Sequence, residues 1–521
     1  MPKRILPSTL KAQDPILMRA IGKICSSVVR RPSSVGSAGR STPRRTTDDA
    51  TNPRAFLVGG FVRDLALKQH PKDADLEVYG VDAKTLEAML KKLFPGRVNA
   101  TGKAFGVFKV NIGRHQELDV ALPRRESKVS KGHKGFSITG DPSMEIAEAA
   151  RRRDFTMNAM LLDPKTGEII DPYHGLDDLA SHTLRIVDPA TFGEDPLRIY
   201  RAIQFAGRFG METDPKSTKL LRDMVKRGMT DELPKERITE ELRKLLLRSE
   251  RPSIGLNLAR VIGLIERDYP ELHKLTQTPQ RSGSHNEGTA WDHTMYVLDG
   301  MAKLIRDPKW TLTDHERIVL MLTAITHDLG KTVAPWRVVQ HISYAFADHP
   351  RAGGVPAATF LNHFSFSDDT NTQVVMLTMN HRRGGVILDQ IRQKECSEDI
   401  LVNERRKLIR DISPITWNAY LVLSSADTLG VIGWNSRQQA HDLVTKLDRL
   451  VKKYRILKLA QTSLLTGADL MKLGMKPSPA MGSLLKEIEK ARDDGRIKTK
   501  KDAIQLAKNL MPDKIQKAIG N

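Results

Sequence analysis

Two aspartates near the start of an apolar run are the first residues whose spacing could support chemistry. Asp73 and Asp75 precede the run Leu76 to Tyr79, and the alternation of a strand would place both carboxylates on one face. Adjacent carboxylates repel one another, so a fold that keeps them together usually supplies a cation, and Mg²⁺ prefers oxygen ligands. The pair therefore predicts a Mg²⁺ site of the kind that serves phosphate chemistry.

A glycine pair lies upstream of these aspartates. The apolar run Phe56 to Val58 predicts a buried strand, Gly59 and Gly60 predict a turn, and a helix is expected to follow. Backbone amides in such a turn can approach a phosphate closely, with the N-terminus of the helix behind them. Each feature alone is more often a plain turn or a solvated strand end, whereas the two in this order indicate nucleotidyl transfer.

The residues around both features match a known pattern. GG-x-V-R-D (59–64) followed by K-D-x-D (72–75) resembles the catalytic head of the class II tRNA nucleotidyltransferase (CCA-adding enzyme) and bacterial poly(A) polymerase family, in its HD-domain-bearing form. The resemblance covers residues 53–511 and implies an α+β fold. It implies a polymerase-β-like nucleotidyltransferase head with a mixed sheet, then an all-α neck, an all-α HD domain and a helical tail.

A cluster of arginines forms the second motif. The string RRRDFTMNAM is similar to the family's RRD-F-T-x-N-A motif, and guanidinium forks bind triphosphate oxygens bidentately. In the family the last arginine contacts the nucleotide, which implies this role for Arg153, with Asp154 and Asn158 as supports. The resemblance also implies that Gly60 and Arg63 help to hold the phosphates.

The third motif, EDPLRIYRAIQFAGRF, contains a candidate base-reading helix. Asp195 before Pro196 also fits a helix N-cap, so a purely structural role remains open. In the family an E-D-x-x-R helix contacts the Watson–Crick edge of the incoming base, which implies this role for Asp195 and Arg198, with Arg201 supporting phosphate or base. The family often has a further arginine where this chain has Gln204, so the contact implied there stays open.

Paired strands are expected around a further carboxylate. The runs 105–112 and 116–122 predict two strands joined by a short turn, and residues 83–93 predict an amphipathic helix. Asp119 on the second strand could approach the aspartate pair as a third carboxylate. An aspartate at a strand end facing water is the equally open alternative.

Histidines gather in the second half of the chain. A His-Asp dipeptide inside an apolar helix is costly unless it is satisfied, and metal ligation satisfies it. The ordered set resembles the metal ligands of HD-domain phosphohydrolases and consists of His293, His327, Asp328 and Asp427. The resemblance implies a divalent transition metal, such as Ni²⁺ or Mn²⁺, with phosphatase and 2′,3′-cyclic phosphodiesterase activities. His349 and His381 stand where such domains hold a second metal or a substrate phosphate.

Composition indicates the class of partner. The 521 residues exceed what one core accommodates, and the formal charge of +21 with a pI near 9.8 indicates a polyanionic partner. Cys25 and Cys396 are the only cysteines, which fits a reducing compartment. No apolar run is long enough to span a bilayer, so we expect a soluble cytoplasmic protein that does not bind a membrane. Nothing indicates its oligomeric state.

The domain boundaries follow from changes in composition. The N-terminal residues are basic, rich in serine and poor in acids, which fits a flexible arm or an organelle transit peptide; within them, 15–29 could form one helix. The expected divisions are a flexible arm (1–52), the head (53–185), a neck that binds base and tRNA (186–275), the HD domain (285–445) and a basic helical tail (446–521).

Together the motifs predict an enzyme, a CCA tRNA nucleotidyltransferase that adds CMP and AMP from CTP and ATP to the tRNA 3′ end without a template. The HD domain is expected to add a metal-dependent phosphohydrolase activity. A poly(A) polymerase or an A-adding enzyme is an alternative, because the motifs are shared across the family. An HD phosphohydrolase whose head only binds RNA is a second alternative, although the intact carboxylate pair argues against it. An RNA-binding protein with both sites inactive would leave the motifs unexplained.

Overall fold

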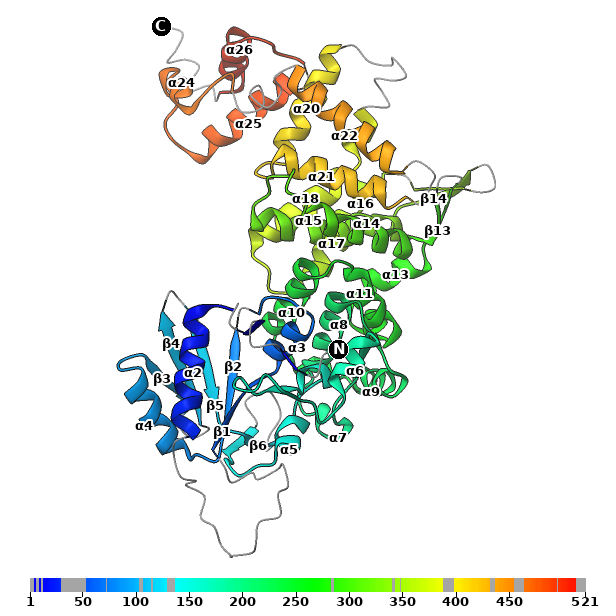
Figure 1. Ribbon diagram of the computed structural model, residues 1–521. Coiled ribbons are helices and arrows are strands. Elements are labelled where there is room, and N and C mark those ends of the chain that lie inside the picture. The colour runs from blue at the N-terminus through cyan, green and yellow to red at the C-terminus, as the bar shows by residue number, and fades with distance from the viewer. Residues whose placement is uncertain are drawn as a thin grey trace, which may run out of the picture. The chain divides into compact units, whose positions relative to one another are not determined.

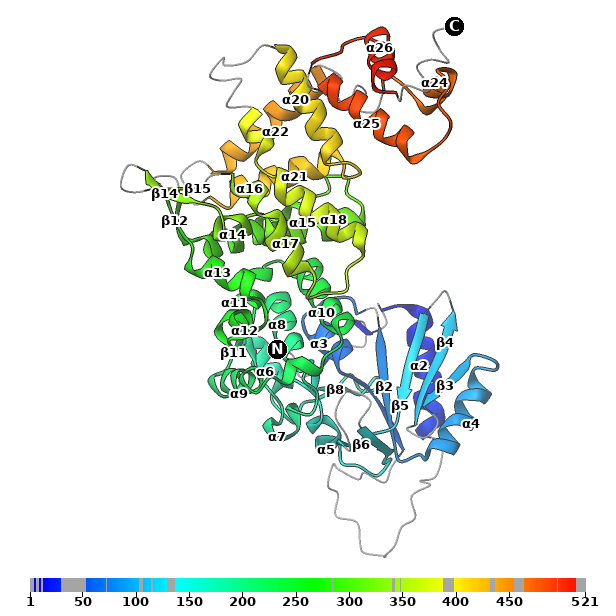
Figure 2. The same cartoon turned by 180° about the vertical axis from the view of Figure 1, so that it is seen from behind.

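The protein divides into two compact units (Figures 1 and 2). The first comprises Met1–Glu241 and Ile254–Leu264, and the second comprises Leu242–Ser253 and Ile265–Asn521, so the neck expected over 186–275 is divided between them. The computed structural model describes residues 4–5, 9–10, 13–29, 53–71, 73–102, 106–113, 116–128, 136–282, 285–339, 343–346, 348–387, 398–431, 436–453, 463–493 and 495–511.

A seven-stranded mixed sheet forms the framework of the first unit. Its order is β3-β4-β5-β2-β1-β8-β9, in which β2 and β5 run parallel and the other neighbours antiparallel. The strands are β1 (Arg54–Val58), β2 (Ala74–Tyr79), β3 (Val98–Gly102), β4 (Val107–Gly113), β5 (Gln116–Ala121), β8 (Leu161–Leu162) and β9 (Ile169–Ile170). The pairing of β4 with β5 and the mixed sheet confirm the expected head architecture.

Helices cover this sheet. The amphipathic helix α4 (Ala83–Leu93) has the predicted bounds, because Asp82 caps it and Leu86, Met89 and Leu90 bury one face. The helix α3 (Gly60–Ala66) follows β1 directly, as the strand–turn–helix pattern predicted.

A helix from the presumed arm belongs to this packed unit. α2 (Pro15–Val29) contacts β1, β4 and α4, and it buries Leu17, Ile21, Ile24 and Val28 (Figure 1). The helix over 15–29 is confirmed, but its assignment to a flexible arm is wrong for these residues, because their apolar stripe is buried against the sheet. Most of the remaining arm, including 30–52, lies outside the described residues.

Helices of the arginine-rich region complete the first unit. Phe155 makes edge-to-face contacts with Phe192 and Phe205 at centroid distances of 5.5 and 5.7 Å, which hold the helix that contains Phe205 against the RRRD segment. The elements are α5 (Ile146–Arg151), η2 (Thr156–Asn158), α6 (Gly175–Ala180), α7 (Pro189–Phe192), α8 (Arg198–Phe209), α9 (Pro215–Lys226), η3 (Met229–Glu232) and α11 (Pro252–Val261), with the strand pairs β6 (Arg124–Lys128)–β7 (Phe136–Gly140) and β10 (Thr183–Leu184)–β11 (Glu212–Thr213). Helix α10 (Lys235–Arg248) passes from the first unit into the second.

The second unit is helical, as expected for an HD domain with a helical tail. Its packed core contains the fully buried Trp291 and Tyr420, and capping boxes at Thr289 and Thr313 begin two of its helices. Two short hairpins, β12 (Pro279–Ser282)–β13 (His285–Thr289) and β14 (Trp336–Val339)–β15 (Ser343–Phe346), accompany the helices. The helices around this core include α13 (Pro270–Gln277), α14 (Ala290–Leu304), α15 (Asp314–Thr326), η4 (Leu329–Thr332), α16 (His349–Ala352), α17 (Gly354–Leu361), α18 (Asp368–Asn380), α20 (Glu398–Asp411), α21 (Trp417–Leu429) and α22 (Ser436–Lys453).

The tail has a small hydrophobic core of its own. Leu470, Ile488 and Ala503 are fully buried within it and come from α24 (Gly467–Lys472), α25 (Pro479–Asp493) and α26 (Lys500–Leu510), respectively. Among the described residues, no helix combines the length and the apolar character that a bilayer crossing requires.

Candidate functional sites

A cationic cavity of about 390 Å³ lies in the first unit, where the strand–turn–helix of the head meets the arginine-rich segment. Seven arginines and three aspartates line it, so its surface favours a polyanionic ligand. The lining consists of Gly59, Gly60, Arg63, Asp75, Arg124, Arg152, Arg153, Asp154, Asn158, Asp195, Leu197, Arg198, Arg201 and Arg237. Every nucleotide-binding residue predicted from the sequence is among them.

The turn after β1 brings a guanidinium and a carboxylate together. Gly59 has φ +69°, and a Cβ atom built there would lie 2.8 Å from Nη1 of Arg153 and 3.9 Å from Oδ2 of Asp75. Only glycine combines this backbone conformation with such a close approach. The glycine pair therefore allows Arg153 and Asp75 to converge on one point.

One carboxylate of the predicted Mg²⁺ site, Asp75, lines this cavity. Asp75 is in β2, Asp73 directly precedes that strand, and Asp119 on β5 is the register partner of Asp75. Removal of water by the surrounding protein raises the pKa of Asp75; Arg153 opposes this, and the carboxylates of Asp119 and Asp73 add to the rise. A cation bound beside Asp75 would relieve this repulsion.

Asp119 has a second partner. Nζ of Lys109 on β4 lies 3.1 Å from its Oδ1 atom, and both side chains are more than a third exposed. Among the described residues, the three head aspartates do not bring three ligand atoms within 4.8 Å of one another. Mg²⁺ is commonly held by one or two carboxylates together with substrate phosphates, so the predicted pair fits this ion without a third carboxylate.

A buried glutamate anchors the arginines, and the sequence reasoning missed it. Glu77 follows Asp75 on the same face of β2, and its Oε1 atom accepts a 3.0 Å hydrogen bond from Nη2 of Arg152. Burial alone would raise the pKa of Glu77, but Arg153, Arg152 and the Tyr79 hydroxyl hold it below its ordinary value. The alternation of acids at 73, 75 and 77 was the signal that could have found it.

A chain of polar contacts connects three elements of the cavity. Nη1 of Arg63 in α3 donates to Oδ1 of Asn158 at 2.7 Å, and Nδ2 of Asn158 donates to Oδ1 of Asp154 at 3.0 Å. The Oδ2 atom of Asp154 in turn accepts from Nε of Arg201 in α8 at 2.7 Å. Asp154 and Asn158 thus hold Arg201 and Arg63 in place.

These contacts also define what Arg63 and Arg201 can do. Arg63 is 5% exposed, its Nε and Nη2 atoms contact Asp64, and its guanidinium stacks over Phe209 at 4.6 Å. Its arrangement therefore favours a positioning role over a strong phosphate contact. Arg201 is half-buried, it pairs with Asp154, and it lines the cavity.

The base-reading candidates lie at the start of α8. Oδ1 of Asp195 accepts from the backbone N–H of Leu197 at 3.1 Å, while its Oδ2 atom lies 3.7 Å from Nη2 of Arg237. Asp195 therefore supports the turn before α8 and still presents a carboxylate to the cavity. Nη2 of Arg198 donates to the backbone carbonyl of Arg152 at 2.8 Å, which holds its side chain against the arginine segment.

The position where the family often has arginine is buried. Gln204 in α8 is 2% exposed and does not line the cavity. Its Nε2 atom has no hydrogen-bond partner among the described residues. Sequence reasoning also missed Arg124, Arg152 and Arg237 as cavity residues: Arg152 lies within the recognised string, but nothing in the sequence singled out the other two.

The predicted HD residues converge in the second unit. Nε2 of His293 in α14 lies 3.2 Å from Oδ1 of Asp427 in α21, and Nε2 of His327 lies 3.3 Å from Oδ2 of Asp328. His293, His327 and Asp328 bring three ligand atoms within 4.8 Å of one another. Burial alone would raise the pKa of Asp427, but a hydrogen bond from His293 and the nearby His327 hold it well below its ordinary value.

A second group of ligand atoms shares Asp328. Its Oδ1 atom lies 3.3 Å from Nε2 of His349, and Asp328, His349 and His381 form another set within 4.8 Å. Burial lowers the pKa of His381 to about 3, so the imidazole is neutral at pH 7, and its Nδ1–H donates to the Thr378 carbonyl at 2.7 Å. This leaves Nε2 of His381 available as a ligand, which is the arrangement that orients metal-binding histidines.

These donors fit a divalent transition metal. Imidazole nitrogens combined with carboxylate oxygens suit ions such as Ni²⁺ and Mn²⁺. A lysine also lies beside this site: Nζ of Lys331 is 2.6 Å from Oδ2 of Asp328. Four imidazoles and two carboxylates gathered in a buried core would otherwise be costly, which is the physical argument for metal binding here.

Comparison with known proteins places parts of this chain in known domain families. Residues 55–185 match the poly A polymerase head domain, and residues 422–507 match tRNA nucleotidyltransferase domain 2. The multifunctional CCA protein of Neisseria gonorrhoeae is 39% identical over 282 residues, which cover 54% of this chain and 63% of that protein. The chain thus spans less than two thirds of the length of this relative. The multifunctional CCA protein of Chromobacterium violaceum is 34% identical over 327 residues, which cover 63% of this chain and 73% of that protein.

Solved structures agree in fold. A Thermotoga maritima CCA-adding enzyme complexed with tRNA matches with a TM-score of 0.54 and 18% identity, covering 97% of this chain and 99% of that one. An apo form of a CCA-adding enzyme matches with a TM-score of 0.56, 18% identity and the same coverage. With 34% identity over 73% of the Chromobacterium violaceum protein, the chain belongs to the family of the multifunctional CCA proteins, the class II CCA-adding enzymes.

Proposed function

We propose that the head adds CMP and AMP from CTP and ATP to the 3′ end of tRNA without a template. The observation that carries this proposal is the convergence of Gly59, Arg153 and Asp75 in a cavity lined by seven arginines. Solved CCA-adding enzymes have been captured with tRNA, with CTP and with ATP, and their fold is the fold of this chain.

The residues divide into three roles. Asp73 and Asp75 would hold Mg²⁺, which when bound neutralises the triphosphate and favours ionisation of the attacking hydroxyl. Arg153, held in place with Arg152 by Glu77, would bind the triphosphate oxygens, whereas Gly60 leaves the turn open to them. In the transfer, the tRNA 3′-oxygen forms a bond to the α-phosphorus, the bond to the bridging oxygen breaks, and pyrophosphate leaves.

Selection of the base falls to the start of α8. Asp195 offers a carboxylate and Arg198 a guanidinium, and together these groups can match the donors and acceptors of cytosine or adenine. The ion pair with Arg237 would keep the Asp195 carboxylate oriented. Protein side chains would thereby replace a nucleic-acid template.

A double substitution tests the assignment. Asp73→Ala with Asp75→Ala should abolish incorporation of CMP and AMP into tRNA that lacks its CCA end. The matched control is Asp177→Ala, which removes an aspartate of the same unit that is 83% exposed. Full incorporation by the folded double variant would refute the proposal. Supplying CTP alone and ATP alone separates the alternatives, since a long product ladder from ATP only indicates a poly(A) polymerase.

The second unit supports a second activity. We propose a metal-dependent phosphohydrolase that opens 2′,3′-cyclic phosphates and removes terminal phosphates. The supporting observation is that Asp328 belongs to both groups of converging ligand atoms. In the reaction a water oxygen forms a bond to phosphorus, one ribose oxygen–phosphorus bond breaks, and the ribose oxygen takes up a proton.

Substitution of a ligand histidine tests this activity. His327→Ala should stop the Ni²⁺- or Mn²⁺-dependent hydrolysis of 2′,3′-cyclic nucleotides and should lower the amount of metal that copurifies. His441→Ala is the control, because this histidine is exposed on α22 of the same unit. If His327→Ala and the wild type hydrolyse equally, the metal assignment is wrong.

A further inference from the structure

A large cavity in the second unit adjoins the candidate metal centre. Its volume is about 620 Å³, within the range of small-molecule sites, and His349 lines it. The same imidazole belongs to the ligand group of Asp328 and His381, and Asn380 and Arg382, which flank His381, also line the cavity. The cavity therefore reaches one of the metal-ligand candidates, His349, and extends away from it.

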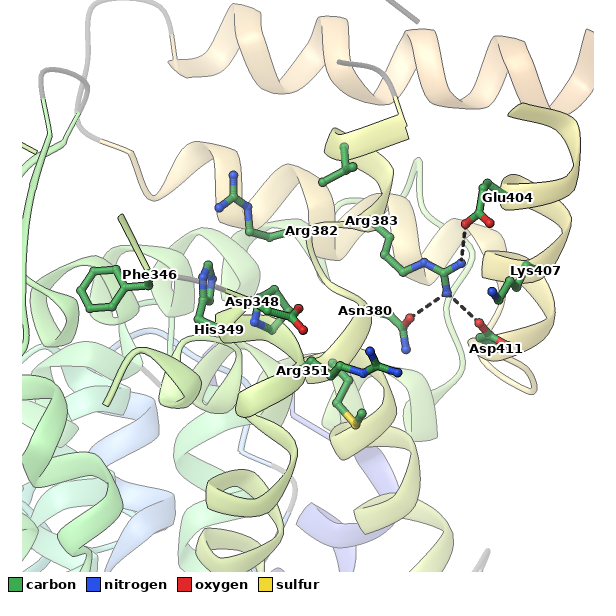
Figure 3. A pocket seen from close by; sticks show the side chains of 13 residues that line it. Phe346, Asp348, His349, Arg351, Asn380, Arg382, Arg383, Glu404, Lys407 and Asp411 are labelled. Atoms are coloured by element: carbon green, nitrogen blue, oxygen red, sulfur yellow. Dashed lines mark hydrogen bonds and ion pairs between the residues drawn. The ribbon is translucent and has the colours of Figure 1, made fainter. Parts of the chain in front are cut away.

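One cation of this cavity is neutralised. Nη1 of Arg383 lies 2.7 Å from Oδ2 of Asp411 and 2.9 Å from Oδ1 of Asn380, and its Nη2 atom lies 3.3 Å from Oε2 of Glu404 (Figure 3). Two of the three acids that line the cavity are therefore engaged with this one guanidinium. The third acid, Asp348, is exposed.

Three further cations line the same cavity. They come from separate elements: Arg351 from α16, Arg382 from the residues after α18, and Lys407 from α20. Among the described residues, no carboxylate lies within ion-pair distance of these three side chains. Figure 3 shows Arg382 on the side of His349 and Lys407 on the opposite side of the view, with Arg351 between them. Unpaired cations that line a concave surface favour a phosphate group.

An apolar wall accompanies these charges. Phe346, Met379 and Val386 line the cavity, and the last two are 36% and 49% exposed. The ring of Phe346 lies 5.9 Å from Nζ of Lys331, the lysine that contacts Asp328. A base or ribose could therefore pack beside the metal centre while a phosphate reaches the cations.

We propose that this cavity binds a nucleotide with two phosphate groups, one at the metal centre and one at a cation of the set Arg351, Arg382 and Lys407. The inference rests on the proposed phosphohydrolase and specifies its substrate class. The chemistry required is a ribose with a phosphate on either side, which a free nucleoside bisphosphate or an RNA 3′ end with a terminal phosphate would supply. A nucleoside with one phosphate leaves the three cations unused.

Binding of non-hydrolysable ligands tests the proposal. The ligands are adenosine 3′-phosphonate, adenosine 3′,5′-bisphosphonate and a dinucleotide RNA that ends in the 3′-phosphonate. Calorimetry uses the full-length Mn²⁺-loaded protein in an Arg153→Ala background, which weakens binding in the head cavity. We expect the second charged group to tighten binding about tenfold, as a charge-assisted contact does, and the gain to shrink at high salt.

Two independent variants locate the second phosphate. Of Arg382→Gln and Lys407→Gln, the variant at the cation that binds the second phosphate should lose the preference for two charged groups, and both should leave the affinity for adenosine 3′-phosphonate unchanged within about twofold. Lys303→Gln, an exposed lysine on α14 outside the cavity, should keep the full preference. Equal affinity of the wild type for one and two charged groups, or a preference retained by both cavity variants, would overturn the inference.

The three ligands also show whether the cavity takes a free nucleotide or an RNA end. A parallel assay of hydrolysis separates this inference from the proposed hydrolase. Tighter binding of the dinucleotide than of the bisphosphonate indicates an RNA end, and the reverse indicates a free nucleotide. If the protein hydrolyses cyclic phosphates but does not prefer ligands with two charged groups, only the substrate-class inference is wrong. If it prefers ligands with two charged groups but hydrolyses no cyclic phosphate, the cavity binds nucleotides with two phosphates and the proposed activity is wrong.

Discussion

The Nη2 atom of Arg201 lies 2.6 Å from Oδ2 of Asp154, and this ion pair ties α8 to the arginine-rich segment of the head. Through Asn158 the same aspartate is connected to Arg63 in α3. The turn that carries Asp195 is thereby held in register with the segment that carries Arg153. The arrangement of the head cavity therefore depends on contacts among the residues that line it.

Asp154→Asn should destabilise the head by about 2 kcal/mol at pH 7, because Arg201 loses its charged partner. Burial alone would raise the pKa of Asp154, but Arg201 and the hydrogen bond from Asn158 hold it below the ordinary value. A depressed carboxyl pKa contributes stability above the unfolded pKa of about 3.9, which is lost as the pH falls through the folded pKa. In urea unfolding, the wild type and Asp154→Asn should differ in unfolding free energy by a constant amount between pH 7 and about 5. This difference should narrow below about pH 4.

The control for this charge effect is Glu87→Gln, which breaks an i,i+4 pair with the 57%-exposed Lys91. It should cost less than about 0.5 kcal/mol. A difference between wild type and Asp154→Asn that persists undiminished at the lowest pH would show that the loss does not come from the carboxylate charge.

Gly59→Ala should reduce nucleotide incorporation about 100-fold, because the new methyl group displaces the Arg153 guanidinium from beside Asp75. Gly96→Ala is a closely matched control: Gly96 also has φ +69°, but a Cβ atom there meets nothing within 4 Å. Both variants should lose about 1 kcal/mol of stability from backbone strain, and only Gly59→Ala should lose activity. Equal activity of the two variants would show that the close approach is unimportant.

Gln204→Leu should leave the KM for CTP and ATP unchanged within about twofold and should not lower the unfolding free energy. The physical reason is that Gln204 is buried outside the cavity, with an Nε2 atom that lacks a partner among the described residues. Steady-state kinetics compares this variant with Arg153→Ala, for which a large increase in KM is expected. A comparable increase for Gln204→Leu would mean that this side chain contacts the triphosphate after all.

Cys25 should resist thiol reagents in the folded protein. Burial raises the pKa of its thiol to about 12, because Cys25 lies on the buried face of α2. In a Cys396→Ser background, labelling should follow the unfolding of the head rather than begin at once. Ser26→Cys with Cys25→Ser places the thiol on the exposed side of α2 and should react rapidly. Rapid labelling of Cys25 itself would show that α2 does not stay packed.

Removal of metal should separate the two proposed activities. After chelation, Mg²⁺ alone should restore nucleotide incorporation, because oxygen ligands such as Asp73 and Asp75 suit this ion. Hydrolysis of 2′,3′-cyclic phosphates should return only with Ni²⁺ or Mn²⁺, because His327 and His381 offer imidazole nitrogens. Both activities are measured on the same chelated sample. Recovery of both with Mg²⁺ alone would contradict the assignment of distinct metals.

Local patterns predicted much of the framework. The apolar stripe of 83–93 predicted α4, and the runs 105–112 and 116–122 predicted β4 and β5 with their pairing. The packing of α2 was not predicted, although Leu17, Ile21 and Val28 form an apolar stripe, because the basic, serine-rich composition around it indicated an arm. Composition averages over a segment, whereas burial depends on which residues share one face.

By itself the sequence determined which chemistries are present: a strand–turn–helix before two aspartates, a string of arginines, and an ordered set of histidines and aspartates. The tertiary structure decided which of these groups meet. Arg63 reaches Asn158 across 95 positions, and His293 reaches Asp427 across 134. Glu77, which sequence reasoning had passed over, proved to be the anchor of Arg152. Such contacts depend on helix packing and strand register, and local periodicity does not encode which buried charges will find a partner.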